Sequence, residues 1–199
     1  MFTLNQIKVL NQSEDFVEKF MASYDWSHDF HHAMRVKKMA TDIALSLNLS
    51  IEDIFEIQLG ALFHDINDEK YRTIDMTQEQ IVSEFLYDKT DTNIIQSVVQ
   101  IACNTSLSKE IESSCPITCI KLFCVQDADR IDSLGSIGIS RYFKYGITQR
   151  NSNLHDIMEN LEARTTSLIS HIKTDYAKGI IHKKIELIKL FIDDYNASI

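Results

Sequence analysis

The scarcity of glycine and proline is the feature that most limits what this chain can fold into. Five glycines and one proline occur in 199 residues, and these two residue types normally supply the tight turns between strands. A sandwich or barrel of many strands is therefore disfavoured, whereas long helices joined by short polar loops fit the pattern. We predict an all-α fold, a compact helical bundle. The length fits one domain, which we expect to span residues 1–199.

Helix-start signals recur in the first half of the chain. Ser50 with Asp53 is close to a capping box, the pair in which a hydroxyl side chain and a side chain three residues later cap a helix. Thr77 with Gln80 is a complete capping box. Ser13 precedes residues with helical spacing, so we expect it to begin the first helix.

The second half of the chain has its own start and stop signals. Pro116 suits the first turn of a helix, which we expect to run to a C-cap at Gly135. Two last helices are predicted within about 154–197, and the last of them has an apolar stripe that faces the core. Three stretches without periodicity are expected to be connections: 67–77, 104–109 and 135–153.

The charge and the hydropathy pattern of the chain argue against nucleic-acid and membrane partners. The net charge is −9 and the pI is about 5.2, and no run of Lys and Arg supplies the basic face that nucleic-acid binders show. No signal peptide begins the sequence and no stretch of 18 apolar residues occurs, so no membrane span is expected. We predict a cytoplasmic protein with no nucleic-acid or membrane partner. A small anionic substrate stays open, because a metal and a few basic residues can reverse the local charge.

Four cysteines occur, at positions 103, 115, 119 and 124, without a CxxC pair. In a chain without a secretory signal, reduced thiols are the favoured interpretation. A zinc site built from them is a distant second.

A group of three histidines stands in the segment "SHDFHHAMRV". His28 and His32 are four residues apart, so on a helix they would share one face. His31 would point about 100° away from that face. A single histidine on an amphipathic helix is most often a surface residue or one with its hydrogen bonds satisfied, and we interpret His155, His171 and His182 in that way.

Two further segments combine acidic and basic side chains with apolar helices. "ALFHDINDEK" places His64 and Asp65 at the end of an apolar run, where burying either group unpaired would be costly. "VQDADRID" supplies three aspartates within six residues, at positions 127, 129 and 132. Taken alone, a His-Asp pair is a weak signal, and the aspartates could form a solvated face paired with Arg130. Two imidazoles and two carboxylates from three helices would suit a borderline divalent ion.

The order of these segments resembles the HD-domain metal-dependent phosphohydrolase superfamily. Its signature is a His on one helix, a His-Asp pair on a second and an Asp on a later helix. The match is closest to a bacterial subgroup of small hydrolases that share "SHDxxHxxRV", "LxHDIxDxK" and "VQDADRxDxxGxIGIxRxFxYG". Here these motifs read "SHDFHHAMRV", "LFHDINDEK" and "VQDADRIDSLGSIGISRYFKYG". The resemblance covers about residues 24–195, with the core motifs within 24–145.

The resemblance implies a role for each matching residue. It assigns one divalent metal ion (Mn, Co, Ni, Fe, Mg or Zn) to His32, His64, Asp65 and Asp129. Asp68 matches an acidic residue that positions or deprotonates the attacking water, so Asp68 is predicted to be catalytic together with His64 and Asp65. His28, Lys70, Arg35 and Arg130 are the predicted substrate contacts, although either arginine could instead be a buried ion-pair partner of Asp65 or Asp127. Asp127 and Asp132 are expected to orient the ligands.

Two departures from the family pattern narrow these expectations. Binuclear HD phosphodiesterases add two histidines between the His-Asp pair and the last Asp, and this chain has none between Asp65 and Asp129. One metal ion is therefore expected. The subgroup carries a His and a Lys in a later helix, where this chain has Asn160 and Arg164, so substrate contacts from that helix are in doubt.

The predicted function is hydrolysis of a small nucleotide. The leading reaction cleaves a (deoxy)nucleoside triphosphate to a monophosphate and pyrophosphate, and a 5′-nucleotidase reaction is the near alternative. A small alarmone hydrolase and a nucleotide-sensing regulatory module without turnover also stay open. A structural protein with fortuitous histidines is the least favoured interpretation. The apolar face of the last helix would permit a homodimer.

Overall fold

The fold is helical throughout the part of the chain that the computed structural model describes, residues 1–26, 28–67, 72, 74–114 and 117–199. The prediction of an all-α fold is confirmed, since no strand occurs among these residues. The helical elements are α1 (Leu4–Phe20), η1 (Met21–Ser23), α2 (Phe30–Ser46), α3 (Ile51–Phe63), α4 (Gln78–Leu86), α5 (Thr92–Cys103), α6 (Leu107–Glu112), α7 (Ile120–Asp132), α8 (Gly135–Arg150), α9 (Leu154–Ser170), α10 (Asp175–Ile180) and α11 (His182–Ser198).

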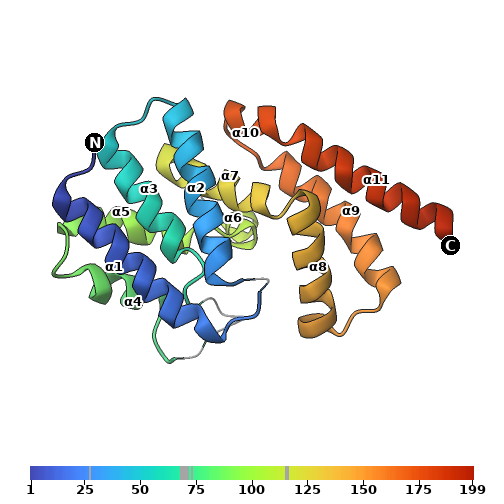
Figure 1. Cartoon of the computed structure of the whole chain (residues 1–199), viewed down its shortest axis with the longest axis horizontal. Helices are drawn as coiled ribbons and strands as arrows, with labels where there is room; N and C mark the ends of the chain where they lie inside the picture. Colours follow the sequence, from blue (N-terminus) through green and yellow to red (C-terminus); the bar gives the residue numbers. More distant parts are fainter. Residues whose placement is uncertain (27, 68–71, 73, 115–116) are drawn as a thin grey trace.

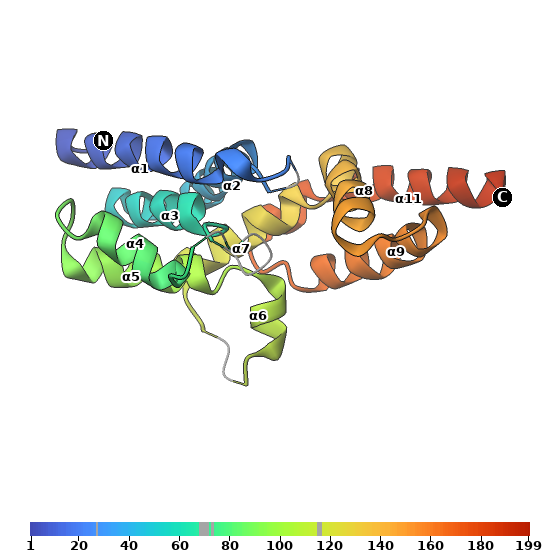
Figure 2. The same ribbon diagram turned by 90° about the horizontal axis from the view of Figure 1, so that it is seen from below.

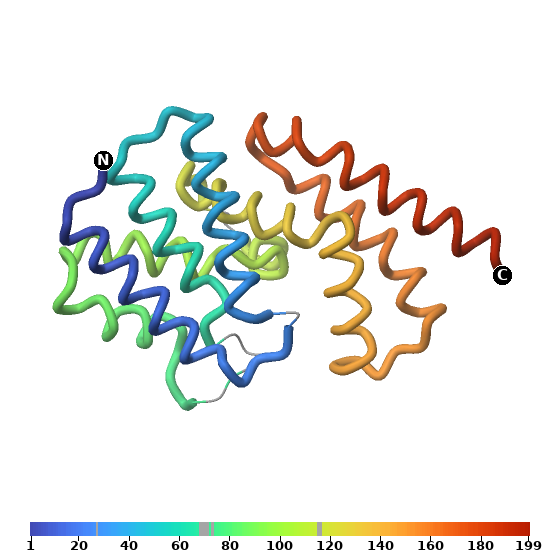
Figure 3. The backbone as a smooth tube through the Cα atoms, in the orientation of Figure 1, coloured from blue at the N-terminus to red at the C-terminus, as the bar shows by residue number. Residues whose placement is uncertain are grey.

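Helix α7 lies between two groups of helices. Figure 1 shows α1 to α5 gathered on one side of α7, and α8, α9 and α11 on the other. The turned view in Figure 2 shows α6 projecting from the body of the molecule. The two termini lie at opposite ends of the trace in Figure 3. Because α7 also packs against α2, α3 and α8, its polar side chains can reach both groups.

The capping signals predicted two helix starts correctly and one wrongly. Ser50 and Thr77 are the N-caps of α3 and α4, and each hydroxyl accepts the expected backbone N–H. Ser13 does not begin a helix, because α1 already starts at Leu4 behind a capping box formed by Thr3. The buried Ser13 hydroxyl donates to the carbonyl of the residue four positions earlier, at 2.8 Å, which is how a helix interior accommodates a serine.

The segment 135–153 was predicted as a connection, and this prediction is wrong. Helix α8 occupies most of it, and α7 ends at a C-cap on Ser133 rather than on Gly135. Gly135 has φ +72° and turns the chain into α8, a conformation that costs glycine little. The glycines that suggested a loop therefore allow two helices to meet at close range.

Gly138→Ala is expected to destabilise the fold. A Cβ at position 138 would lie 2.2 Å from the carbonyl oxygen of Ser133 and 2.3 Å from its carbonyl carbon, so the start of α8 would have to move away from α7. We expect urea denaturation to show a loss of about 2–3 kcal/mol in the free energy of unfolding. Gly179→Ala is the control, since a Cβ there meets no atom within 4 Å. Equal effects of the two substitutions would contradict this account.

The second of the two predicted last helices is divided into two, α10 and α11. The chain breaks at Ile181, between α10 and α11. Within the predicted stripe of α11 Ile188 is buried, whereas Phe191 is 37% exposed, so only part of the stripe faces the core. No helix among the described residues is long and apolar enough to cross a membrane.

The cysteines that the structure describes carry free thiols, as predicted. These are Cys103, Cys119 and Cys124. Cys115 and the predicted helix start at Pro116 lie outside the described residues.

Candidate metal centre

Three helices that pack together carry the predicted metal ligands. Helix α2 packs on both α3 and α7. Asp29 caps α2, and its carboxylate accepts the backbone N–H of His32 at 2.9 Å, which fixes His32 in the first turn. Helix α3 ends directly before His64 and Asp65, so both follow its buried, apolar run. Asp129 stands in the last turn of α7.

Three of the four side chains, those of His32, His64 and Asp65, bring ligand atoms within 4.8 Å of one another, and Asp129 lies beside the two imidazoles. His32 Nε2 lies 3.2 Å from His64 Nε2, 3.3 Å from Asp65 Oδ2 and 3.4 Å from Asp129 Oδ1. His64 Nε2 lies 3.4 Å from Asp65 Oδ1 and 3.9 Å from Asp129 Oδ1. Ligand atoms about 2.0–2.2 Å from one metal ion are separated by roughly 3.0–3.5 Å. Most of the observed separations fall in this range, and the remaining one exceeds it by less than half an ångström.

The hydrogen bonds of the two imidazoles favour a cation between them. His32 Nδ1 donates to Asp132 Oδ2 and His64 Nδ1 donates to the carbonyl of Ala61, both at 2.8 Å. In the neutral form that binds a metal, the other nitrogen of each ring carries a lone pair, so both Nε2 atoms can be ligands of one ion. In addition, Asp65 Oδ2 is buried and has no hydrogen-bond donor. These unmatched electron pairs fit a divalent metal ion, whose histidine ligands typically donate their other N–H in this way.

The pKa values of the centre reflect its concentration of negative charge. Burial and the positive charge of Arg141 work to lower the pKa of His32, but the adjacent carboxylates of Asp129, Asp132 and Asp65 outweigh them and raise it to about 10. Burial would raise the pKa of Asp65, yet the two neighbouring imidazoles hold it well below its usual range. The carboxylates thus stay ionised, and without a metal ion His32 holds a second proton, which a divalent ion bound at Nε2 would displace.

The comparison with protein families identifies the fold around this centre. The HD domain family model matches residues 29–134, just over half of the chain, and this range contains the side chains of His32, His64, Asp65 and Asp129. The chain belongs to the HD-domain family. This superfamily of metal-dependent phosphohydrolases is the one predicted from the order of the His, His-Asp and Asp motifs.

Relatives of this HD domain are found in bacteria and in a virus. Protein YpgQ of Bacillus subtilis is 25% identical over 143 residues, which cover 71% of this chain and 68% of YpgQ. Protein L803 of Acanthamoeba polyphaga mimivirus is 26% identical over 158 residues, covering 71% of this chain and 63% of L803. Two crystal structures share the HD fold: YpgQ in complex with ADP (TM-score 0.80, 21% identity, 98% and 97% of the two chains) and an HD-superfamily hydrolase from Bacillus thuringiensis (TM-score 0.75, 24% identity, 97% of each chain).

Asp132 organises the HD centre, as predicted. Besides the N–H of His32, its carboxylate accepts Arg35 Nε and Nη2 at 2.7 and 3.0 Å and Arg141 Nη1 at 2.9 Å. Burial would raise the pKa of Asp132, but His32 and the two arginines hold it far below its usual range. Asp132 therefore stays ionised and fixes both the tautomer and the orientation of His32. No role was predicted for Arg141 from the sequence, although it lies in the family motif "VQDADRIDSLGSIGISRYFKYG".

Asp127 does not orient a metal ligand, which corrects the prediction. It is fully buried, and its carboxylate accepts the backbone N–H groups of Lys173 and Thr174 and the hydroxyl of Thr174. Asp127 thus anchors the segment before α10 to α7. Its position on the helix directs it toward this segment, away from the metal centre.

Arg130 is also corrected, from a substrate contact to a buried ion-pair partner. Its side chain is 1% exposed. Its Nη2 donates to Glu110 and its Nη1 donates to the carbonyl of His171 at 2.5 Å. The guanidinium is therefore committed to neighbours inside the protein. A buried ion pair was the alternative that the sequence left open, but with Asp65 or Asp127 as the partner, whereas the main partner in the structure is Glu110.

The remaining residues with a predicted substrate or catalytic role differ in their distance from the metal centre and in whether the structure describes them. Arg35 is 35% exposed at the side chain while it binds Asp132. His28 lies outside α2, which begins at Phe30, so the expected shared helix face is wrong. The rings of His28 and His32 are nevertheless 6.1 Å apart. His31 is exposed, as expected of a residue without a site role. Asp68 and Lys70 lie outside the described residues, and their roles stay predictions.

A cavity of about 300 Å³ adjoins the metal centre. His28 and Arg141 belong both to its lining and to the surroundings of His32. The cavity is also lined by Arg150 at the end of α8 and by Arg164 on α9, and none of the described residues that line it is acidic. In the sequence, Arg164 was identified only as a departure from the family pattern. No sequence motif marks Arg150 as a cavity residue, because tertiary packing brings it to the cavity.

Proposed function

We propose that this protein is a metal-dependent phosphohydrolase that cleaves a small nucleotide. The leading substrates are nucleoside or deoxynucleoside triphosphates, cleaved to a monophosphate and pyrophosphate. One observation carries the proposal: the cavity beside the metal centre has three arginines and no acidic residue among its described lining, in a chain of net charge −9. Such a reversal of charge suits a polyphosphate.

The lining of the cavity supplies contacts for more than phosphate. The guanidinium of Arg150 lies over the ring of Tyr145, 5.2 Å from its centroid, and the ring of His28 is 6.0 Å from the same tyrosine. Burial raises the pKa of Tyr142, while Arg150 and Arg164 work to lower it, which places both cations near this phenol. Aromatic faces of this kind can stack on a nucleobase while arginines hold the phosphates.

A relative supports the nucleotide class. YpgQ of Bacillus subtilis, which shares the fold, has been crystallised in complex with ADP. ADP carries both a nucleobase and a chain of phosphates, the two groups that the cavity of this protein is suited to hold.

Each group of residues has a part in the proposed reaction. His32, His64, Asp65 and Asp129 would hold the divalent ion, which when bound polarises a phosphoryl group and lowers the pKa of a water. Asp132 keeps His32 in the tautomer that presents Nε2. The arginines of the cavity offset the charge on the phosphoryl oxygens, at positions fixed before substrate arrives. The predicted roles of Asp68 as base or water-orienting group, and of Lys70 as a phosphate contact, belong to the same scheme.

A hydrolysis screen tests the proposal. The protein is incubated with Mn²⁺, Co²⁺, Ni²⁺ or Mg²⁺ and with nucleoside mono-, di- and triphosphates and guanosine alarmones, and the products are separated. We expect triphosphates to yield monophosphate and pyrophosphate. Release of phosphate from monophosphates would instead indicate a 5′-nucleotidase, and cleavage of alarmones alone would indicate an alarmone hydrolase. Binding of nucleotide without turnover under any metal would overturn the enzymatic proposal in favour of a regulatory module.

Arg164→Gln is expected to lower kcat/KM for a triphosphate by about 10- to 100-fold, since it removes a charge-assisted contact to phosphate. The loss for the corresponding monophosphate should be smaller, because fewer charges need to be offset. Lys189→Gln removes the same charge from an exposed position on α11 and should leave the kinetics unchanged. Equal decreases of kcat/KM for the monophosphate and the triphosphate would show that Arg164 does not contact the additional phosphates.

A further inference from the structure

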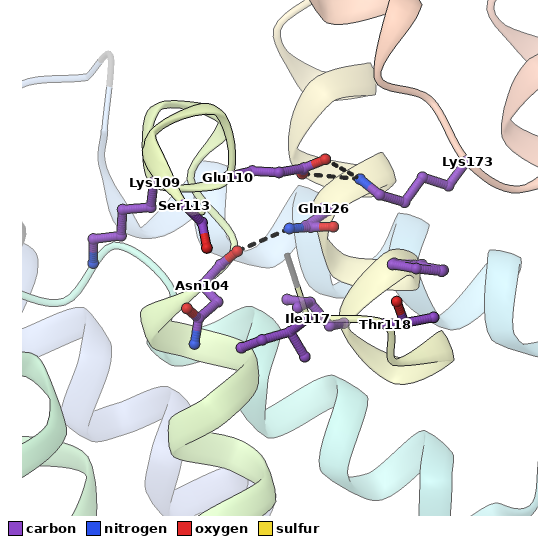
Figure 4. A pocket seen from close by; sticks show the side chains of 10 residues that line it. Asn104, Lys109, Glu110, Ser113, Ile117, Thr118, Gln126 and Lys173 are labelled. Atoms are coloured by element: carbon purple, nitrogen blue, oxygen red, sulfur yellow. Dashed lines mark hydrogen bonds and ion pairs between the residues drawn. The ribbon is translucent and has the colours of Figure 1, made fainter. Parts of the chain in front are cut away.

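A second cavity lies beside α7, between α6 and the segment that leads to α10 (Figure 4). Its volume is about 100 Å³. It shares no lining residue with the substrate cavity and includes none of the four metal-facing side chains. Gln126 forms part of its wall and precedes Asp129 by three residues on α7. The cavity is therefore separate from the metal centre.

Gln126 brings an unmatched acceptor to this cavity. The residue is 3% exposed, and its amide nitrogen donates to the carbonyl of Asn104 at 2.9 Å. Its amide oxygen Oε1 is buried and has no donor among the described residues. Figure 4 shows the amide nitrogen toward Asn104 and the oxygen on the opposite side of the group. A buried carbonyl without a donor destabilises the structure, so a ligand that donates to it would gain an interaction.

The charged groups in the wall are already paired with one another. Lys173 Nζ lies 2.9 Å from both carboxylate oxygens of Glu110, which also accepts Arg130. The same ammonium lies 5.2 Å from the centroid of the Phe123 ring. With these charges offset, the wall offers little to an ionic ligand beyond the exposed Lys109 at the edge. A neutral ligand fits this arrangement better.

The remaining wall is apolar and sets the shape of the ligand. Ile117, Leu122 and Phe123 provide hydrophobic surface around the Gln126 acceptor. The volume equals that of roughly three liquid waters, which admits one small ring and excludes a nucleoside. We propose that this cavity binds a neutral, single-ring heterocycle of pyrimidine size, which donates an N–H group to Gln126 Oε1 and packs its faces on the apolar wall. The site is independent of the proposed hydrolase activity.

A pair of matched pyrimidines tests the proposal. Uracil has two N–H donors, and 1,3-dimethyluracil has none. Each is titrated into the isotopically labelled full-length protein while NMR follows the side-chain amide signals of Gln126, assigned from their loss in Gln126→Met. We expect uracil to shift these signals saturably, and 1,3-dimethyluracil to bind at least about tenfold more weakly. In Gln126→Met, followed through the backbone amide of Phe123, uracil affinity should fall by a similar factor.

A control variant separates this site from the substrate cavity. Arg164→Gln alters that cavity only, so uracil should still shift the Gln126 signals in it. The proposal is overturned if uracil leaves those signals unchanged, if both pyrimidines bind equally well, or if Arg164→Gln abolishes the shifts. A crystal structure grown with uracil that has only ordered water at Gln126 Oε1 would overturn it as well.

Discussion

His64→Ala is expected to deprive the protein of its divalent metal and of phosphohydrolase activity. The variant removes one of two imidazoles whose Nε2 atoms lie 3.2 Å apart, and the group of possible metal ligands among the described residues contains no third histidine. Loss of a group that merely orients a ligand costs metal affinity about 10- to 100-fold, so loss of a ligand should cost more than 100-fold. Activity should fall by about 10³-fold or more, since several kcal/mol of charge stabilisation depend on the ion. Metal content after dialysis and hydrolysis rate are the two measurements.

The control for this experiment is His155→Ala. The His155 side chain is 65% exposed on α9, and its loss should change neither metal content nor rate. Metal retained at wild-type stoichiometry in His64→Ala would contradict the assignment of the centre. If His64→Ala loses metal but the wild type hydrolyses no nucleotide, the metal site stands and the choice of substrate is wrong.

The metal-facing side chains could be found in the sequence because each belongs to a local motif. His32 stands three residues after the N-cap of α2, and His64 and Asp65 follow the buried apolar run of α3. The residues next to them in the sequence therefore predict that they lie at helix ends. The order of the motifs then pairs them with Asp129. No local sequence motif predicts which residues line the substrate cavity. Arg150 and Arg164 meet only because α8 folds back against α9, and no periodic pattern marks that meeting.

Errors in the predicted fold have a similar origin. Glycines in 135–146 were interpreted as loop residues, although Gly138 serves a contact with the backbone of Ser133 that only the packed structure reveals. Ser13 has the chemistry of an N-cap, but the stronger capping box at Thr3 begins the helix earlier. Local signals therefore predicted which residues can cap a helix. They did not say which candidate the tertiary structure would use.

Asp127 and Asp132 illustrate the limit of assigning a role from residue type. Both are buried aspartates on α7, five residues apart. Asp132 binds His32 and two arginines, whereas Asp127 binds the backbone ahead of α10. At about 100° per residue, a separation of five residues turns the second carboxylate by roughly 140°. One helix thus holds the metal centre with one face and the C-terminal helices with another.

Asp127→Ala is accordingly expected to cost stability while sparing the metal. The substitution leaves the N–H groups of Lys173 and Thr174 without their acceptor, along with the Thr174 hydroxyl, which now donates to Asp127 Oδ2 at 2.8 Å. It also removes a negative charge 3.9 Å from the buried Arg130. Breaking such a buried charged network costs about 3–5 kcal/mol. Urea denaturation should show a loss of this size in the free energy of unfolding, with a smaller loss for Asp127→Asn, which keeps a carbonyl acceptor.

Two comparisons decide whether the loss comes from the contact with the segment before α10. Asp175→Ala changes a fully exposed aspartate in the first turn of that helix and should alter stability by no more than about 0.5 kcal/mol. Amide hydrogen exchange should accelerate at Lys173 and Thr174 in Asp127→Ala, whereas metal affinity should stay at the wild-type value. Loss of metal affinity with stability unchanged would contradict the assignment, because it would return Asp127 to the role predicted from the sequence, that of orienting a metal ligand.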